Sequence, residues 1–212
     1  WQSSEIRPHS FVLFFSILNL ILFINLIKNN KSTILIITYL ISSLILLSSW
    51  PFTLTIYIGK TAYLLVHFKK LNIPISKIFI IYSLIILIYV LLNYEYLIYH
   101  LKRDFHYTNL EISFFYSFHF RSFFGSIFLG AIFLILFSFY LIKDFKENTL
   151  SKNDINILLY IIITTYFLVI SYSILRAGVI SPKYVIFILP LIIIWICNKI
   201  KLSKYKKTIS LI

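Results

Sequence analysis

The chain has 212 residues, of which 60% are hydrophobic, 19% aromatic and only 13% charged. A soluble domain carries about 25% charged residues, so this chain lacks the polar surface that a globular domain needs in water. Its net charge of +13 does not indicate nucleic-acid binding, because the basic residues fall between apolar segments, as they do in membrane loops. We therefore expect an all-α integral membrane protein that has membrane lipid, and no nucleic acid, as a partner.

Apolar segments follow one another along the chain. A membrane helix needs about 20 apolar residues, and lipid cannot satisfy open backbone groups, so each segment is predicted to be helical. The segment 33–68 is too long for one crossing, and Trp50-Pro51 in its middle predicts two spans joined by a tight turn. Seven spans are expected: Ser10–Ile27, Thr33–Ser49, Phe52–Phe68, Ile78–Tyr94, Ser126–Ile142, Ile155–Ile174 and Tyr184–Asn198. They predict a polytopic helix bundle that forms a single membrane domain over residues 1–212.

The charges of the loops predict how the bundle is oriented. Lysines are concentrated in the loops after the first, third and fifth spans and in the carboxyl-terminal tail. Loops rich in lysine and arginine face the cytoplasm, so this side and the carboxyl terminus are expected there. The loops 95–125 and 175–183 are then outside. A bacterial inner membrane is the expected location.

The outer loop Glu95–Gly125 is the longest connection. From Leu110 it reads LEISFFYSFHFRSFF, an aromatic-rich pattern that predicts a helix lying in the membrane interface. Two interpretations stay open: a simple anchor or packing segment, and one wall of a site for a lipid substrate. His100, Asp104 and His106 match no standard ligand spacing, so no metal ligand is assigned.

Charged residues at the ends of spans are candidate ligands for a lipid phosphate. Arg176 and Lys183 flank a short outer loop, and Lys183-Tyr184 opens a helix, where free N–H groups and a nearby cation favour phosphate. The alternative is an interfacial lysine beside a tyrosine anchor. Glu5 and Arg7 precede the first span, where they pair with each other, line a cleft or form an ordinary helix start.

Two residues inside the spans also carry information. Lys60 lies within the third span, where a charge is expensive in lipid, so it is expected to face a polar interior or to extend toward the membrane surface. Pro190 lies within the last span and predicts a kink.

Three stretches together resemble bacterial GT-C membrane glycosyltransferases, the dolichyl-phosphate-mannose protein mannosyltransferase-like family. Residues 4–10, SEIRPHS, are similar to the family segment E-a-R-p-Y-s-l, with His9 in place of tyrosine. Residues 121–126, RSFFGS, are similar to its fFGS stretch. Residues 183–190, KYVIFILP, resemble the R-Y-l-i-f-l-l-P start of a late helix. The stretches occur in the family's order and run along most of the chain.

The resemblance implies an inverting transferase that moves a sugar from a polyprenyl-phosphate donor to an extracytoplasmic lipid, glycan or protein. The residues expected to bind the donor are Arg7, Lys183, Tyr184, Arg176 and Glu5. The family's catalytic acidic residue lies in a first outer loop that would precede Trp1, so no catalytic residue is assigned in this chain. The resemblance assigns no cofactor.

The chain contains no methionine, so we expect it to be processed or a fragment. The resemblance implies that it is the carboxyl-terminal portion of a larger GT-C protein, inactive by itself. The alternative function is non-enzymatic: a multi-span transporter of polysaccharide or lipid, or a receptor. Transporters commonly show broken helices and repeated halves, which the sequence does not indicate.

Overall fold

The computed structural model describes residues 9–28, 32–67, 75–102, 121, 124–146, 156–175 and 185–202. The regular structure in these ranges is helical throughout, which confirms the all-α class. The chain divides into two compact units, of which unit 1 ends at Tyr107 and unit 2 begins at Thr108. The single membrane domain expected from the sequence stays a prediction.

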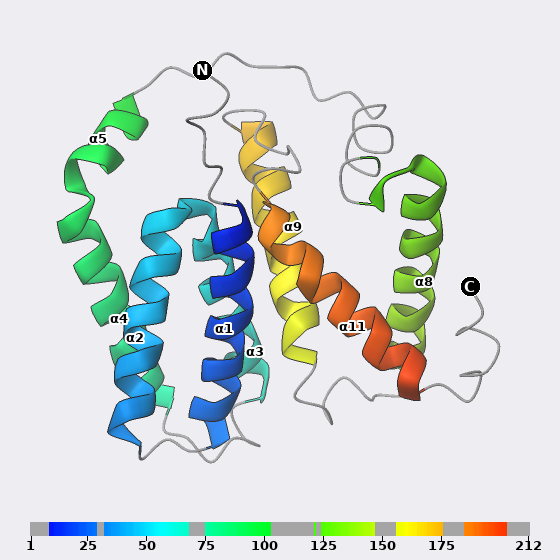
Figure 1. Ribbon diagram of the computed structural model, residues 1–212, viewed down its shortest axis with the longest axis horizontal. Coiled ribbons are helices and arrows are strands. Elements are labelled where there is room, and N and C mark those ends of the chain that lie inside the picture. The colour runs from blue at the N-terminus through cyan, green and yellow to red at the C-terminus, as the bar shows by residue number, and fades with distance from the viewer. Residues whose placement is uncertain are drawn as a thin grey trace. The chain divides into compact units, whose positions relative to one another are not determined.

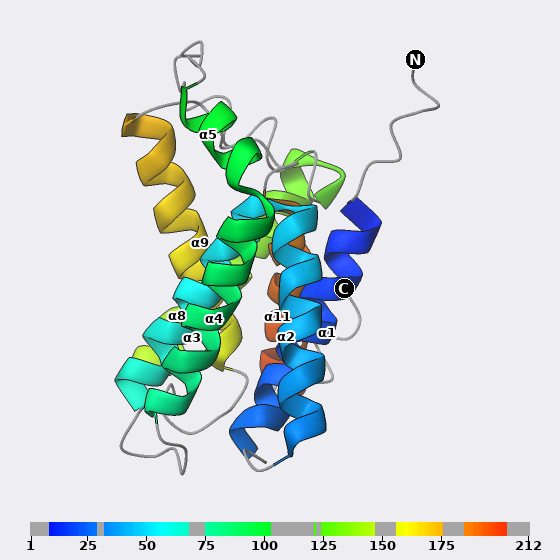
Figure 2. The same cartoon turned by 90° about the vertical axis from the view of Figure 1, so that its left-hand side faces the viewer.

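Unit 1 is a set of helices that form at the expected apolar segments. Its α-helices are α1 (His9–Lys28), α2 (Thr33–Ser49), α3 (Leu54–His67), α4 (Ile75–Leu92) and α5 (Tyr94–Lys102). The helices α1 and α2 run antiparallel and lie side by side in both views (Figures 1 and 2), and α2 also contacts α4. Three helices of this unit, α1, α2 and α3, carry the buried polar residues described below.

The tight turn expected at Trp50-Pro51 is confirmed. The helix α2 ends at Ser49, and the short 3-10 helix η1 (Pro51–Thr53) leads directly into α3. Pro51 lacks a backbone N–H and so interrupts the helical hydrogen bonds. The Thr53 N–H and hydroxyl close the turn by donating to the Trp50 carbonyl over 3.0 and 2.7 Å.

The sequence predicts that the outer loop begins at Glu95, and this boundary is wrong, because α5 continues beyond α4 to Lys102. The two helices meet at Asn93. Its N–H donates to the Tyr89 carbonyl over 3.0 Å, and its own carbonyl accepts from the Leu97 N–H over 2.9 Å, so helical hydrogen bonds continue across it. The Asn93 side chain also donates to the Tyr89 carbonyl over 3.0 Å, a competing bond that marks the boundary without ending the helix.

Unit 2 contains α8 (Ile127–Lys146), α9 (Asn156–Leu175), the 3-10 helix η5 (Ile186–Ile188) and α11 (Leu189–Leu202). The helix α11 contacts both α8 and α9. Within this unit α8 and α11 run in one direction and α9 in the other (Figure 1). The start of α8, the end of α9 and the start of η5 therefore share one end of the unit, which we call the Gly125 end.

Pro190 changes the last span near its start. The chain forms the 3-10 turn η5 and then becomes α-helical at Leu189, so Pro190 is the second residue of α11. Proline is tolerated in a first helical turn, where its missing N–H has no helical partner to lose. The structure thus has a change of helix type just before Pro190, and the kink predicted at this residue stays a prediction.

Two helices among the described residues are long and apolar enough to cross a membrane: α1 and the segment Asn156–Ser173 of α9. Among the helices at the other expected spans, α2 has 17 residues. The helix α3 has 14 residues, which at 1.5 Å per residue reach about 21 Å, less than the roughly 30 Å of a hydrocarbon core. Seven complete crossings therefore stay a prediction.

Candidate functional site

The donor-binding residues expected from the sequence, Glu5, Arg7, Arg176, Lys183 and Tyr184, lie outside the described residues, as does the interfacial segment 110–124 except for Arg121 and Phe124. Two of these positions are tied by the chain to described elements of unit 2. Arg176 directly follows the last residue of α9, and Tyr184 directly precedes Val185, where the described chain resumes. Both attachment points are at the Gly125 end of unit 2.

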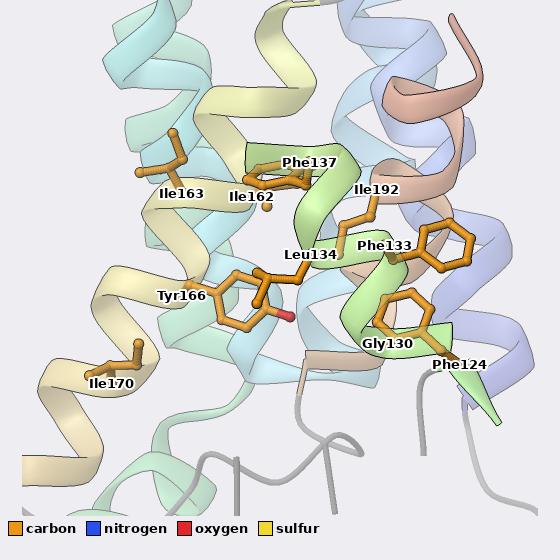
Figure 3. Close-up of a pocket in the computed structure, with 10 residues that line it drawn as sticks. All are labelled: Phe124, Gly130, Phe133, Leu134, Phe137, Ile162, Ile163, Tyr166, Ile170 and Ile192. Atoms are coloured by element: carbon orange, nitrogen blue, oxygen red, sulfur yellow. The ribbon is translucent and has the colours of Figure 1, made fainter. Parts of the chain in front are cut away.

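Unit 2 contains a cavity of about 420 Å³. This volume is within the roughly 300–1,000 Å³ typical of small-molecule sites. The lining residues are Phe124, Gly130, Phe133, Leu134, Phe137, Ile162, Ile163, Tyr166, Ile170 and Ile192. Figure 3 shows the Tyr166 ring extending from α9 toward Leu134 on α8. The lining is aliphatic and aromatic except for the Tyr166 hydroxyl, so the cavity suits a hydrocarbon group.

The position of the cavity along α8 and α11 is not central. It uses residues 130–137 of α8, residues 162–170 in the middle of α9, and Ile192 near the start of α11. On α8 and α11 the lining is displaced toward the Gly125 end, where Phe124 also lines the cavity. A hydrocarbon chain in the cavity would therefore have its polar group at that end.

The chain just before α8 closes one side of the cavity. Phe124 stacks on Phe133, with ring centroids 4.7 Å apart and an angle of 14° between the planes. Gly125 follows with φ of +78°, a conformation that glycine adopts without steric cost. Ser126 then begins α8, since its hydroxyl accepts from the Leu129 N–H over 3.1 Å, the usual N-cap bond.

The far side of the cavity is packed. Phe137 lines the cavity and contacts Trp195 on α11, with ring centroids 5.0 Å apart. The Trp195 side chain is fully buried. The Lys199 amino group lies 5.6 Å from the centre of the Trp195 ring, within cation–π range. The interior beyond Phe137 is therefore filled by side chains and leaves no extension toward the Lys199 end of α11.

Unit 1 holds a different kind of interior, centred on Lys60. Its side chain is 0% exposed, which confirms the expectation that this residue faces a polar interior. The amino group donates to Asn19 Oδ1, to the Asn19 carbonyl over 3.5 Å and to the Tyr39 hydroxyl over 3.4 Å. It also lies 4.8, 5.1 and 5.2 Å from the ring centres of Phe23, Tyr39 and Tyr57, so three aromatic faces replace water around the charge.

Asn19 connects this lysine to α2. Its side-chain N–H₂ donates to the hydroxyls of Ser42 and Ser43 over 3.0 and 2.9 Å. Both hydroxyls in turn donate to the Tyr39 carbonyl, over 3.0 and 2.6 Å. The polar cluster, defined as Asn19, Tyr39, Ser42, Ser43 and Lys60, is therefore hydrogen-bonded throughout. It joins the three helices α1, α2 and α3.

These two interiors have different capacities. The polar cluster satisfies its own donors and acceptors, so its role is to hold the helices together. The cavity offers apolar space with a single hydroxyl, so it is suited to binding a ligand. Sequence reasoning placed Lys60 correctly, but it missed the cavity, since the lining residues look like ordinary apolar spans. The one available signal was Phe124-Gly125 directly before α8.

No family model, curated protein or solved structure matches the chain. The function is therefore inferred from the polar cluster and the cavity.

Proposed function

We propose that this chain is a multi-span integral membrane protein and supplies the donor-binding part of a GT-C-type sugar transferase. The cavity of unit 2 binds the hydrocarbon chain of a polyprenyl-phosphate sugar donor. The sugar then passes to an acceptor outside the cytoplasmic membrane. The carboxyl terminus lies on the cytoplasmic side, as the distribution of lysines indicates.

The distribution of polar and apolar side chains supports a lipid environment. Asn19, Ser43 and Lys60 are 0% exposed. On the outside, Ile34, Ile80 and Phe128 are 76, 68 and 74% exposed. Water favours the reverse arrangement, whereas in lipid polar residues gather between helices and apolar ones face outward. The exposed residues are then in contact with acyl chains.

The observation that best supports a prenyl phosphate as the ligand is the cavity. Its lining has the apolar character of a prenyl chain, and Phe124 in that lining directly precedes Gly125, which supports a polar headgroup at the Gly125 end. The segment 176–184, with Arg176 and Lys183, is joined to the described elements at that same end. Arginine offers paired hydrogen bonds to phosphate and lysine a point charge, so this segment is suited to a phosphate headgroup.

The proposed reaction places demands on these groups. An acceptor oxygen forms a bond to the anomeric carbon while the bond from that carbon to the phosphate oxygen breaks, which releases polyprenyl phosphate. The acceptor proton goes to the acidic residue that the family resemblance places before Trp1. The basic residues at the Gly125 end stabilise the phosphate as its negative charge grows.

The proposal is tested with a photoreactive prenyl phosphate and two variants of neighbouring residues on α8. Leu134 lines the cavity and is 52% exposed, while Ile135 does not line it and is 67% exposed. Leu134→Trp fills the cavity and is expected to lower labelling of α8 and α9 by about tenfold, equivalent to about 1.4 kcal/mol. Ile135→Trp, which adds the same ring to the outer surface, is expected to label as the wild type does.

Equal labelling of the two variants would contradict prenyl binding in the cavity. A second arm of the experiment distinguishes the transferase from the non-enzymatic alternative, a lipid carrier or receptor. The full-length protein is supplied with a polyprenyl-phosphate sugar that carries an isotope label in the sugar. Transfer of the label to an acceptor supports the transferase, and binding without transfer supports the carrier or receptor.

A further inference from the structure

A basic residue stands one helical turn before the aromatic wall of the cavity. The Arg121 carbonyl accepts a hydrogen bond from the Gly125 N–H over 2.9 Å, so the two ends of this turn are held together. Residues three apart in such a turn have Cβ atoms about 5–6 Å apart. Arg121 is therefore within one side-chain length of Phe124, which lines the cavity.

The turn is fixed to α8 rather than being a free loop end. Phe124 stacks on Phe133 in the cavity wall, as Figure 3 shows. Gly125 adopts a positive φ of 78° and directs the chain into the capped start of α8. The Arg121 side chain is exposed. The geometry thus holds the backbone of Arg121 beside the cavity while its guanidinium remains accessible.

Charge is distributed unevenly in unit 2. Lys143 and Lys146 are in the last turn of α8, and Lys199 and Lys201 are near the end of α11. Those ends lie opposite the Gly125 end. Within the described part of unit 2, Arg121 is thus the one basic residue at the Gly125 end, where Phe124 lines the cavity.

We propose that Arg121 binds the phosphate of the lipid whose hydrocarbon chain occupies the cavity of unit 2. This inference rests on the proposed function and adds a residue that the family resemblance does not assign. The ligand is a prenyl phosphate: the chain enters between α8 and α9, and the phosphate receives paired N–H donors from the guanidinium. The exposed guanidinium stays in water or the headgroup layer when no ligand is bound, so the site carries no buried, unpaired charge.

The test compares a short prenyl phosphate with the corresponding prenyl alcohol, each binding to the purified chain in nanodiscs of zwitterionic lipid. Arg121→Gln is expected to weaken phosphate binding about ten- to a hundredfold, the range for loss of a charge-assisted hydrogen bond. Binding of the alcohol is expected to stay within about twofold of the wild type, which also shows that the variant is folded. Arg121→Lys is expected to be intermediate, since it keeps the charge and loses the paired donors.

Lys143→Gln is the matched control, because it removes one positive charge from the same unit at the opposite end. It is expected to change neither affinity. If Arg121→Gln and Lys143→Gln bind prenyl phosphate equally well, the assignment to Arg121 is wrong. Inorganic phosphate is added as a competitor, and displacement of the prenyl phosphate at equal concentration would instead indicate a site for free anions.

The binding data also distinguish failure of the proposed function from failure of the Arg121 assignment. If the wild-type chain binds neither the phosphate nor the alcohol, or if Leu134→Trp binds both normally, the cavity does not hold prenyl chains. If Leu134→Trp blocks both ligands while Arg121→Gln binds the phosphate normally, prenyl binding stands and only the role of Arg121 is overturned.

Discussion

The two units place polar atoms in opposite ways. In unit 1 the interior is polar and closed: Lys60 is 0% exposed, and its amino group bonds to Asn19 and the Tyr39 hydroxyl. In unit 2 a cavity of about 420 Å³ has an apolar lining except for the Tyr166 hydroxyl. The first arrangement uses polar groups to hold helices together. The second leaves apolar space for a ligand.

In the membrane environment that we propose, unit 1 needs such a cluster. Lipid tails are as apolar as leucine, so apolar contact alone gives helices little reason to associate or to choose one face. The sequence of α1 is apolar on all sides, and its buried face contains Ser16 and Asn19. The bonds from Asn19 to Ser42, Ser43 and Lys60 therefore select which face of α1 meets α2 and α3.

The largest effect is expected from breaking the cluster at its centre. Asn19→Leu removes the side-chain acceptor of Lys60 and leaves a buried amino group poorly compensated, at a cost of about 3 kcal/mol. Asn25→Leu is the matched control, because Asn25 is also on α1 but is exposed. Denaturant unfolding in detergent measures both variants. An equal loss of stability in the two would show that the cluster does not hold α1.

A smaller effect is expected from removing the charge instead of its partner. Lys60→Met leaves Asn19 Oδ1 without its charged donor, which costs about 1–2 kcal/mol. In the double variant Asn19→Leu, Lys60→Met, both polar partners are replaced by apolar groups, and stability is expected to return to within about 1 kcal/mol of the wild type. Strictly additive losses in the double variant would mean that the two side chains act independently.

Much of the fold was predictable from the sequence. Long apolar segments identify the helices, because a buried or lipid-facing backbone must satisfy its own hydrogen bonds. The Trp50-Pro51 break and the interior position of Lys60 follow from the missing N–H of proline and from the cost of a charge in apolar surroundings. Each of these rests on a local property of one residue or one segment.

What was not predictable depends on pairs of distant residues. Asn19 and Lys60 are 41 positions apart, and no periodicity in α1 indicates which side it buries. The continuation of α4 into α5 depends on hydrogen bonds across Asn93 that apolar patterning does not report. The cavity arises from the packing of three elements, so neither its lining nor the position of Arg121 beside it follows from any one segment.

The smallest effect is expected where the aromatic wall of the cavity is weakened without being removed. Phe133→Leu keeps an apolar side chain but loses the stacking with Phe124, which is worth about 0.5–1.5 kcal/mol. The turn that carries Arg121 is then less firmly held to α8. Binding of prenyl phosphate is expected to fall by about three- to tenfold, while binding of prenyl alcohol changes less, since the cavity itself remains.

Phe128→Leu provides the comparison for this variant, because Phe128 is on the same helix, is 74% exposed and does not line the cavity. It is expected to bind both ligands as the wild type does. If Phe133→Leu weakens the alcohol and the phosphate to the same extent, the aromatic wall shapes the cavity only. A selective loss of the phosphate means that the stacked pair positions the cation. In that case unit 2 also has a polar residue that packing holds in position. This residue is Arg121, at the edge of the apolar interior, whereas Lys60 is at the centre of unit 1.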